Sequence, residues 1–261
     1  MKRRNFLKTS LSMGSLILLN KKPFINISLP QNNKYHNSEY TPGGQISSKA
    51  FVLDKDLNKH NLIDLCKALD SKVIFLYIYG GAVVNDSRRL GNIWCPDSFE
   101  DMHIIRFVHS KYKEAEVKLI PVACPPIYSS QNYGFEKRVF LDHSESSKKF
   151  TESSKAFIEK TEDITHSGLI PIDTYYDLRF RLLFNRRKNL QPGKDYGNIF
   201  EWQGQFRGPG DNQKYGTPTL WLLNSKGTIL EKPFWGNIYH SEPYRIRYTI
   251  LDVDKAIQRY L

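Results

Sequence analysis

Cysteine is the residue type in this chain whose chemistry is easiest to argue from position. There are three, Cys66, Cys95 and Cys124, and Cys95 stands in the stretch Trp-Cys-Pro-Asp-Ser at residues 94–98. A thiolate attacks disulfides, and its availability depends on the thiol pKa. The cysteine spacings match neither a disulfide framework nor a zinc pattern, and we expect no metal and no cofactor.

The residues after Cys95 specify the start of a helix. Pro96 suits the first helical position, and Asp97 favours the first turn. Cys95 is then the N-cap, where the positive end of the helix stabilises a thiolate. We therefore expect the Cys95 pKa to fall below the free-thiol value of about 8.5, and Ser98 to hydrogen-bond the thiolate.

The elements around Cys95 predict a parallel βαβ unit. Residues 72–81 and 117–124 are continuous apolar runs typical of strands buried on both faces, and residues 96–113 between them have helical spacing. Such a crossover is right-handed by default. Cys66 falls among the apolar positions of a short helix and is interpreted as a core residue.

A second motif lies at residues 215–230, Tyr-Gly-Thr-Pro-Thr-Leu-Trp-Leu-Leu-Asn-Ser-Lys-Gly-Thr-Ile-Leu. It predicts a tight turn into a strand over 219–223 and a short antiparallel return. Together with Trp-Cys-Pro before a helix, it resembles the thioredoxin superfamily, in particular its redoxin (alkyl hydroperoxide reductase and thiol-specific antioxidant) branch.

The resemblance implies a fold and a site. The fold is α/β, a thioredoxin-like three-layer arrangement with a mixed central sheet and a long insertion before the cis-proline strand. Cys95 is implied to be the attacking cysteine, and Trp94, Thr217 and Pro218 to bind substrate, with the bond before Pro218 cis. The second cysteine of the family's Cys-x-x-Cys pair is replaced by Ser98.

Cys124 is the candidate partner for Cys95. It ends the second parallel strand, and open α/β sheets place their sites at this edge. A disulfide requires Cα atoms within about 7 Å, so the sequence leaves both a pair and an unpaired thiol open. Arg88 and Asn92 stand where the peroxiredoxin motif has Pro and Thr, which argues against an efficient peroxidase.

The domain is predicted to span residues 48–261 with an insertion at about 125–214. We expect helices over residues 146–162 and 175–188 of the insertion. The C-terminal part of the insertion, with Trp202 and Phe206, is interpreted in two ways. It either covers the active cysteine or only fills space in the fold.

The N-terminus predicts export. Residues 1–22 resemble a twin-arginine signal around Arg3 and Arg4, and residues 23–47 read as a linker. This implies the export machinery as a partner and a periplasmic or extracytoplasmic location, tethered if the signal is uncleaved. We expect no stable membrane span. The net charge is +11, of which six charges lie in residues 1–22, so nucleic-acid binding is not indicated.

Three functions remain open from the sequence. The first is an exported thioredoxin-fold protein that acts on protein or small-molecule thiols and disulfides through Cys95. It would form a mixed disulfide that Cys124 or an external thiol resolves. The second is a non-catalytic thioredoxin-fold binding module, and the third a peroxiredoxin-like peroxidase.

Overall fold

The computed structural model describes residues 42–82, 93–125, 148–178, 197–206, 216–235 and 248–261. The predicted signal, most of the linker and parts of the insertion lie outside these ranges. The strands are β1 (Phe51–Leu53), β2 (Lys59–Asn61), β3 (Val73–Gly80), β4 (Val117–Cys124), β5 (Tyr175–Tyr176), β6 (Thr219–Leu223) and β7 (Phe234–Trp235). The helices are α1 (Leu62–Leu69), α2 (Pro96–Tyr112), α4 (Lys148–His166), α6 (Ile199–Gly204) and α7 (Ile250–Gln258).

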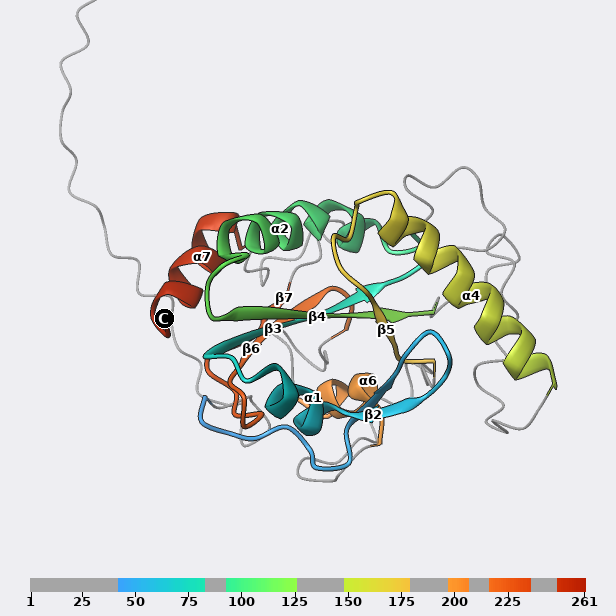
Figure 1. Ribbon diagram of the computed structural model, residues 1–261, viewed down its shortest axis with the longest axis horizontal. Coiled ribbons are helices and arrows are strands. Elements are labelled where there is room, and N and C mark those ends of the chain that lie inside the picture. The colour runs from blue at the N-terminus through green and yellow to red at the C-terminus, as the bar shows by residue number, and fades with distance from the viewer. Residues whose placement is uncertain (1–41, 83–92, 126–147, 179–196, 207–215, 236–247) are drawn as a thin grey trace, which may run out of the picture. The chain divides into compact units, whose positions relative to one another are not determined.

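The strands form one mixed sheet, in the order β2-β1-β5-β4-β3-β6-β7 among the described residues. The pairs β3–β4 and β4–β5 are parallel, and β3 pairs antiparallel with β6 on its other side. Helices α2 and α7 cover one face of the sheet, and α1 and α6 the other (Figure 1). This is the predicted three-layer α/β arrangement with a mixed central sheet.

The central strands β3 and β4 carry the site. Every residue of β3 is buried, and its side chains alternate between the two cores of the domain. The two strands pair in register from Val73 with Val117 to Gly80 with Cys124. The predicted strand–helix–strand unit is confirmed, and both strands end at the same edge of the sheet.

Helix α7 is fixed to α2 by a buried carboxylate. Lys111 on α2 donates to both oxygens of Asp254, at 2.6 and 2.7 Å, and Tyr112 donates to one of them at 2.6 Å. Burial would raise the pKa of Asp254, but these hydrogen bonds and the Lys111 charge outweigh it and lower the pKa below its usual value of 3.8. The contact holds α2, whose N-cap is Cys95, against the C-terminal helix.

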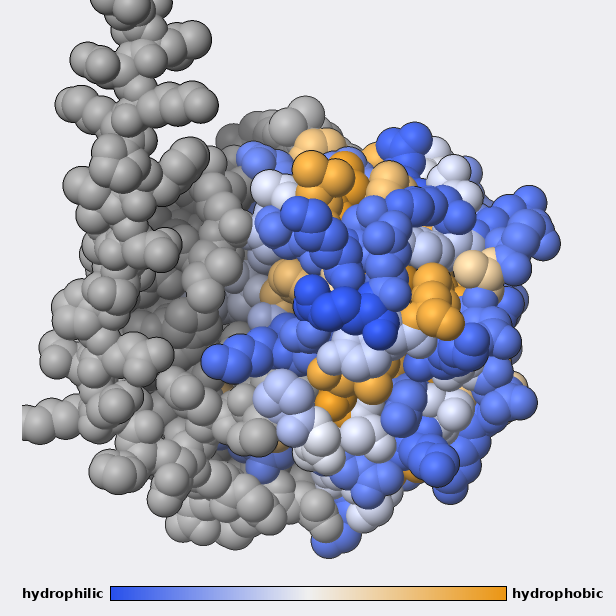
Figure 2. Space-filling view, turned by 90° about the vertical axis from the view of Figure 1, so that its left-hand side faces the viewer, coloured by the Kyte–Doolittle hydropathy of each residue, from blue (hydrophilic) through white to orange (hydrophobic). Residues whose placement is uncertain are grey.

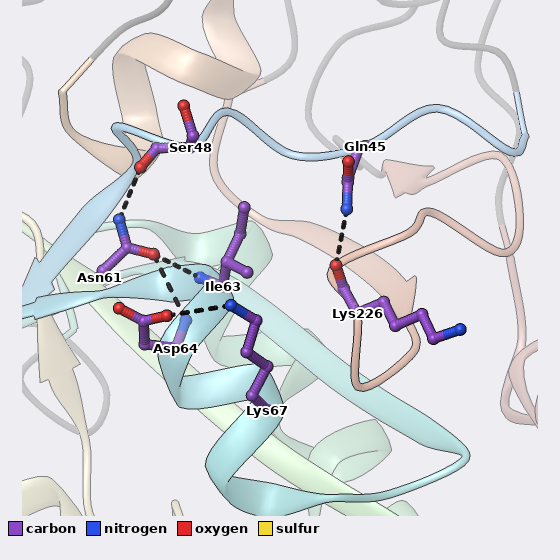
Figure 3. A network of polar contacts seen from close by, with 7 residues as sticks. All are labelled: Gln45, Ser48, Asn61, Ile63, Asp64, Lys67 and Lys226. Carbon is purple, nitrogen blue, oxygen red and sulfur yellow. Dashed lines mark hydrogen bonds and ion pairs between the residues drawn. The ribbon is translucent and has the colours of Figure 1, made fainter.

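A polar network ties the start of the domain to the sheet (Figure 3). Asn61 caps α1 and donates from its side-chain amide to the carbonyl of Ser48 at 2.7 Å. The Gln45 amide donates to the carbonyl of Lys226 at 2.9 Å. Ordered contacts therefore begin a few residues before the predicted boundary at residue 48.

The insertion contributes to the sheet as well as to the helices. Helix α4 confirms the prediction of a helix at residues 146–162 from Lys148 onward and continues to His166, while residues 146 and 147 lie outside the described ranges. The prediction of a helix from residue 175 is wrong at its start, because Tyr175 and Tyr176 form strand β5 beside Val122 and Ala123. Pairing with a buried strand edge outweighs a helical spacing pattern. Residues 179–188 lie outside the described part of the chain.

The described surface carries few large apolar side chains. The exposed ones among the described residues are Leu251 and Leu261. On the face shown in Figure 2, hydrophobic residues lie in small separate groups among hydrophilic ones. None of the helices in the described ranges combines the length and apolar character that a membrane crossing requires.

We predict that Asp254→Asn lowers the free energy of unfolding at pH 7 by about 1 to 2 kcal/mol, because hydrogen bonds to a buried charge are lost. The difference from wild type should shrink as the pH falls from about 4, where Asp254 of the unfolded chain takes up a proton, through the lower pKa of the folded protein. Denaturant unfolding across this pH range is the measurement.

The control is Glu152→Gln, which removes the same charge from an exposed pair with Lys148. A surface pair of this kind contributes about 0 to 1 kcal/mol. Equal losses in the two variants would contradict the role given to Asp254.

Candidate functional site

Cys95 is the N-cap of α2, as the sequence predicts. Its backbone is extended, with φ −97° and ψ 108°, and proline follows at the first helical position. The Cys95 carbonyl accepts the first helical hydrogen bond, from the N–H of Phe99 at 3.1 Å. Only 5% of the residue is exposed.

The position of Cys95 depends on Gly80 at the end of β3. A Cβ built on Gly80 would lie 2.3 Å from the Cys95 Cβ and 2.7 Å from the Trp94 ring, closer than real Cβ contacts allow. Only glycine therefore lets the start of α2 approach the strand this closely. The apolar pattern of residues 72–81 predicts the strand but not this contact, because the contact depends on a segment more than ten residues away in the chain.

Ser98 fastens the helix to the same strand end. Its hydroxyl oxygen is buried and accepts a hydrogen bond from the Gly80 N–H at 3.0 Å. The Ser98 carbonyl accepts from the Tyr77 hydroxyl at 3.0 Å. Ser98, predicted to assist the thiolate, therefore also joins the first turn of α2 to β3.

Trp94 lies inside the protein. Its indole N–H donates to the carbonyl of Cys124 at 2.7 Å, and its backbone N–H donates to the carbonyl of Gly81 at 3.0 Å. With 7% of its surface exposed, Trp94 positions the Cys95 segment over the strand ends in this structure. That Trp94 also binds substrate stays a prediction.

Cys124 comes close to Cys95 through Gly80. Gly80 and Cys124 are paired in the β3–β4 register. Paired residues on neighbouring strands lie about 5 Å apart and face the same side of the sheet. The Cys124 side chain therefore points to the same side as the open space at Gly80. The Cys95 Cβ occupies the space in front of Gly80. The two cysteines are therefore neighbours at the sheet edge, and all three cysteines of the chain are free thiols.

Thr217 and Pro218 close the other side of Cys95. The Cys95 sulfur donates to the carbonyl oxygen of Thr217 at 3.7 Å, across 122 residues of sequence. The peptide bond between Thr217 and Pro218 is cis. Strand β6 follows directly and pairs with β3. The structure thus brings together the two motifs that the sequence singled out.

The strand order, the crossover helix and this pairing of motifs define the architecture. The fold is thioredoxin-like. No family model and no curated protein matches the chain.

Solved structures with similar chains have low identity. A thioredoxin-family thiol:disulfide interchange protein from Chlorobium tepidum TLS is 10% identical, with a TM-score of 0.41 over 85% of this chain and 99% of that one. The thioredoxin domain of a thiol-disulfide oxidoreductase from Bacteroides vulgatus is 9% identical, with a TM-score of 0.42 over 85% of this chain and all of that one.

The electrostatics of Cys95 correct the sequence-based expectation. Burial raises the pKa of the Cys95 thiol to about 11, and the charge of Asp97 adds to the rise, although hydrogen bonding with Ser98 opposes it. A helix end contributes about 0.3 to 1 kcal/mol, whereas removing a charge from water costs several kcal/mol. The expected depression below 8.5 is therefore wrong for this enclosed state.

The other two thiols are enclosed more completely. Burial raises the pKa of Cys66 to about 12. Cys66 lies on the buried side of α1 and packs in the core, as predicted. Burial also raises the pKa of Cys124 well above its usual value, and the charge of Asp177 adds to it. Cys95 is thus the most exposed of the three thiols.

Within the described ranges, no group of three or more His, Cys, Asp or Glu side chains is arranged to hold a metal ion. The site instead consists of two neighbouring thiols, one serine hydroxyl and a backbone carbonyl. Such a set can form and break sulfur–sulfur bonds.

We predict that Gly80→Ala lowers the free energy of unfolding by about 1 to 3 kcal/mol through overpacking and speeds alkylation of Cys95. The added methyl group must push the Cys95 segment away from β3. Denaturant unfolding and mass-spectrometric labelling with iodoacetamide measure the two effects.

Gly197→Ala is the control, because a Cβ there meets only the edge of the Phe51 ring, at 3.1 Å. It should leave Cys95 labelling unchanged. If Gly80→Ala labels Cys95 at the wild-type rate, the close approach does not enclose the thiol.

A second prediction concerns pH. Because thiolate is the reacting form and the pKa is about 11, the Cys95 alkylation rate should rise roughly tenfold per pH unit from 7 to 9.5. Timed labelling with iodoacetamide followed by peptide mass spectrometry gives the rates. A plateau beginning below pH 8.5 would reveal an activated thiolate.

Proposed function

We propose that this chain is an exported, redoxin-like thiol–disulfide protein that reduces disulfides through Cys95, with Cys124 as the resolving thiol. The observation that carries the proposal is the contact at Gly80. At this contact the Cys95 Cβ lies beside Gly80, the residue that pairs with Cys124 on the neighbouring strand. Neither cysteine needs a cofactor to act in this way.

The chemistry balances within the pair and its substrate. The Cys95 thiolate attacks a substrate disulfide, forms a mixed disulfide and releases the first substrate thiolate. The Cys124 thiolate then attacks the Cys95 sulfur, forms the Cys95–Cys124 disulfide and releases the second. The substrate gains two electrons and two protons, and an external dithiol must reduce the pair again.

The direction of the reaction follows from the thiol environment. A pair becomes a strong oxidant when its reduced form is stabilised, as with a low-pKa thiolate. Here burial raises the pKa of both thiols, so no thiolate is stabilised. This supports a reductant rather than an oxidant, and the same raised pKa gives no support to a peroxidase.

Substrate recognition is assigned to Thr217 and Pro218. The Thr217 carbonyl lies against the Cys95 sulfur, so a chain that reaches the sulfur must pass this segment. An extended peptide can pair with exposed backbone beside a reactive group. Export is proposed from the N-terminal sequence alone, with Arg3 and Arg4 addressed to the twin-arginine machinery.

One observation favours a second candidate. Cys95 is 5% exposed with a protonated thiol, which also suits a binding module that has lost turnover. Such a module would bind a thiol- or disulfide-containing partner without exchanging electrons with it.

The test uses a fluorescent peptide disulfide, the reduced full-length protein and three cysteine-to-serine variants. Wild type should cleave the peptide and end with a Cys95–Cys124 disulfide. Cys95→Ser should be inactive, Cys124→Ser should accumulate a mixed disulfide at Cys95, and Cys66→Ser should behave as wild type. Peptide mapping by mass spectrometry identifies each species.

The outcomes separate the alternatives. Peptide binding without cleavage by wild type would overturn the reductase and favour the binding module. Full turnover by Cys124→Ser would remove Cys124 from the mechanism and make an external thiol the resolving group.

A further inference from the structure

Helix α6 comes from the insertion and packs on strand β6 beside the site. Trp202 and Phe206 contact Trp221 of β6, with ring centroids 4.8 and 5.9 Å away. In Figure 1, α6 lies on the face of the sheet opposite α2. The insertion thus reaches the strand that follows Thr217 and Pro218.

Within this apolar contact, one polar side chain is fully buried. Gln203 is 0% exposed. Its amide nitrogen donates to the carbonyl of Gly216 at 3.1 Å, and its amide oxygen accepts from the Trp221 indole at 3.2 Å. A buried amide is costly unless its hydrogen bonds are made. Gln203 makes them, and one of its two partners is the backbone beside Thr217.

The chain from Gln203 to the Cys95 sulfur is short. Gly216 immediately precedes Thr217, whose carbonyl accepts the Cys95 thiol hydrogen bond at 3.7 Å. The Thr219 hydroxyl also donates to the Gly216 carbonyl. A rotation of the Gly216 peptide group would therefore move the Thr217 carbonyl relative to the sulfur.

Helix α6 is itself held on the other side of the site. The carboxylate of Asp177 accepts from the Phe200 N–H at 2.5 Å, and the Asp177 N–H donates to the carbonyl of Ala123 at 3.0 Å. The helix is thus tied to the end of β4, next to Cys124. Helix α6 is therefore linked both to the β4 end beside Cys124 and to the segment that precedes Pro218.

We propose that Gln203 is a positioning residue for Cys95, which holds the Gly216–Pro218 segment so that the Thr217 carbonyl stays against the sulfur. The inference rests on the proposed function, because it treats Cys95 as the reacting group. It makes the insertion a part of the site, acting through one amide on α6.

The test compares labelling of two cysteines in the same native protein. Cys66 lies in the core and has 0% exposure, so its alkylation reports opening of the whole domain. Gln203→Met keeps the side-chain length but removes both hydrogen bonds. It should raise the Cys95 iodoacetamide rate at pH 8 by about two- to tenfold relative to Cys66, the change expected from one hydrogen bond.

One further variant separates the partners of Gln203. Trp221→Phe removes the indole donor and leaves the Gly216 bond, so it should leave the Cys95-to-Cys66 ratio at the wild-type value.

Equal acceleration of Cys95 and Cys66 in Gln203→Met would show a purely structural role and overturn the inference, as would an unchanged ratio. A changed ratio in Trp221→Phe as large as in Gln203→Met would also overturn it. Because labelling needs no disulfide substrate, these results do not depend on turnover. Failure of the peptide assay would refute the proposed function while leaving the labelling ratio measurable.

Discussion

The site depends on the contact between the start of α2 and the bare backbone of Gly80. Because Gly80 has no side chain, the Cys95 Cβ can occupy the space that a Cβ at residue 80 would fill. The Gly80 N–H then meets the Ser98 hydroxyl, and the register of β3 with β4 sets Cys124 beside the same point. One close approach therefore fixes the helix, its capping thiol and the partner thiol together.

The cost of burying charge decides the state of these thiols. The helix end favours a Cys95 thiolate, but its field is worth less than the solvation that an enclosed sulfur loses. The thiol consequently stays protonated and donates a hydrogen bond to the Thr217 carbonyl. Under the proposed function, this enclosure shields the two thiols until a substrate contacts the segment that ends at Pro218.

The insertion is built into the domain rather than attached to it. Strand β5 joins the sheet between β1 and β4, and α4 adds Phe157 and Ile158 to the core on the α2 side. Helix α6 supplies Trp202 to the opposite core. A chain segment that contributes to both cores and to the sheet cannot be removed without exposing apolar surface that is now buried. This explains why its residues also reach the site.

Residues close together in the chain were enough to predict the local elements and the motifs. Continuous apolar runs predicted β3 and β4. Helical spacing and Pro96 predicted α2 with Cys95 as its N-cap. The motif around Pro218 predicted the segment that faces Cys95. These features depend on residues near one another in the chain. The tertiary structure alone decided that Trp94 points inward, that Tyr175 and Tyr176 form a strand, and that the Cys95 pKa rises. Each depends on what packs around a residue from distant segments, because solvation and strand pairing are properties of the assembled fold.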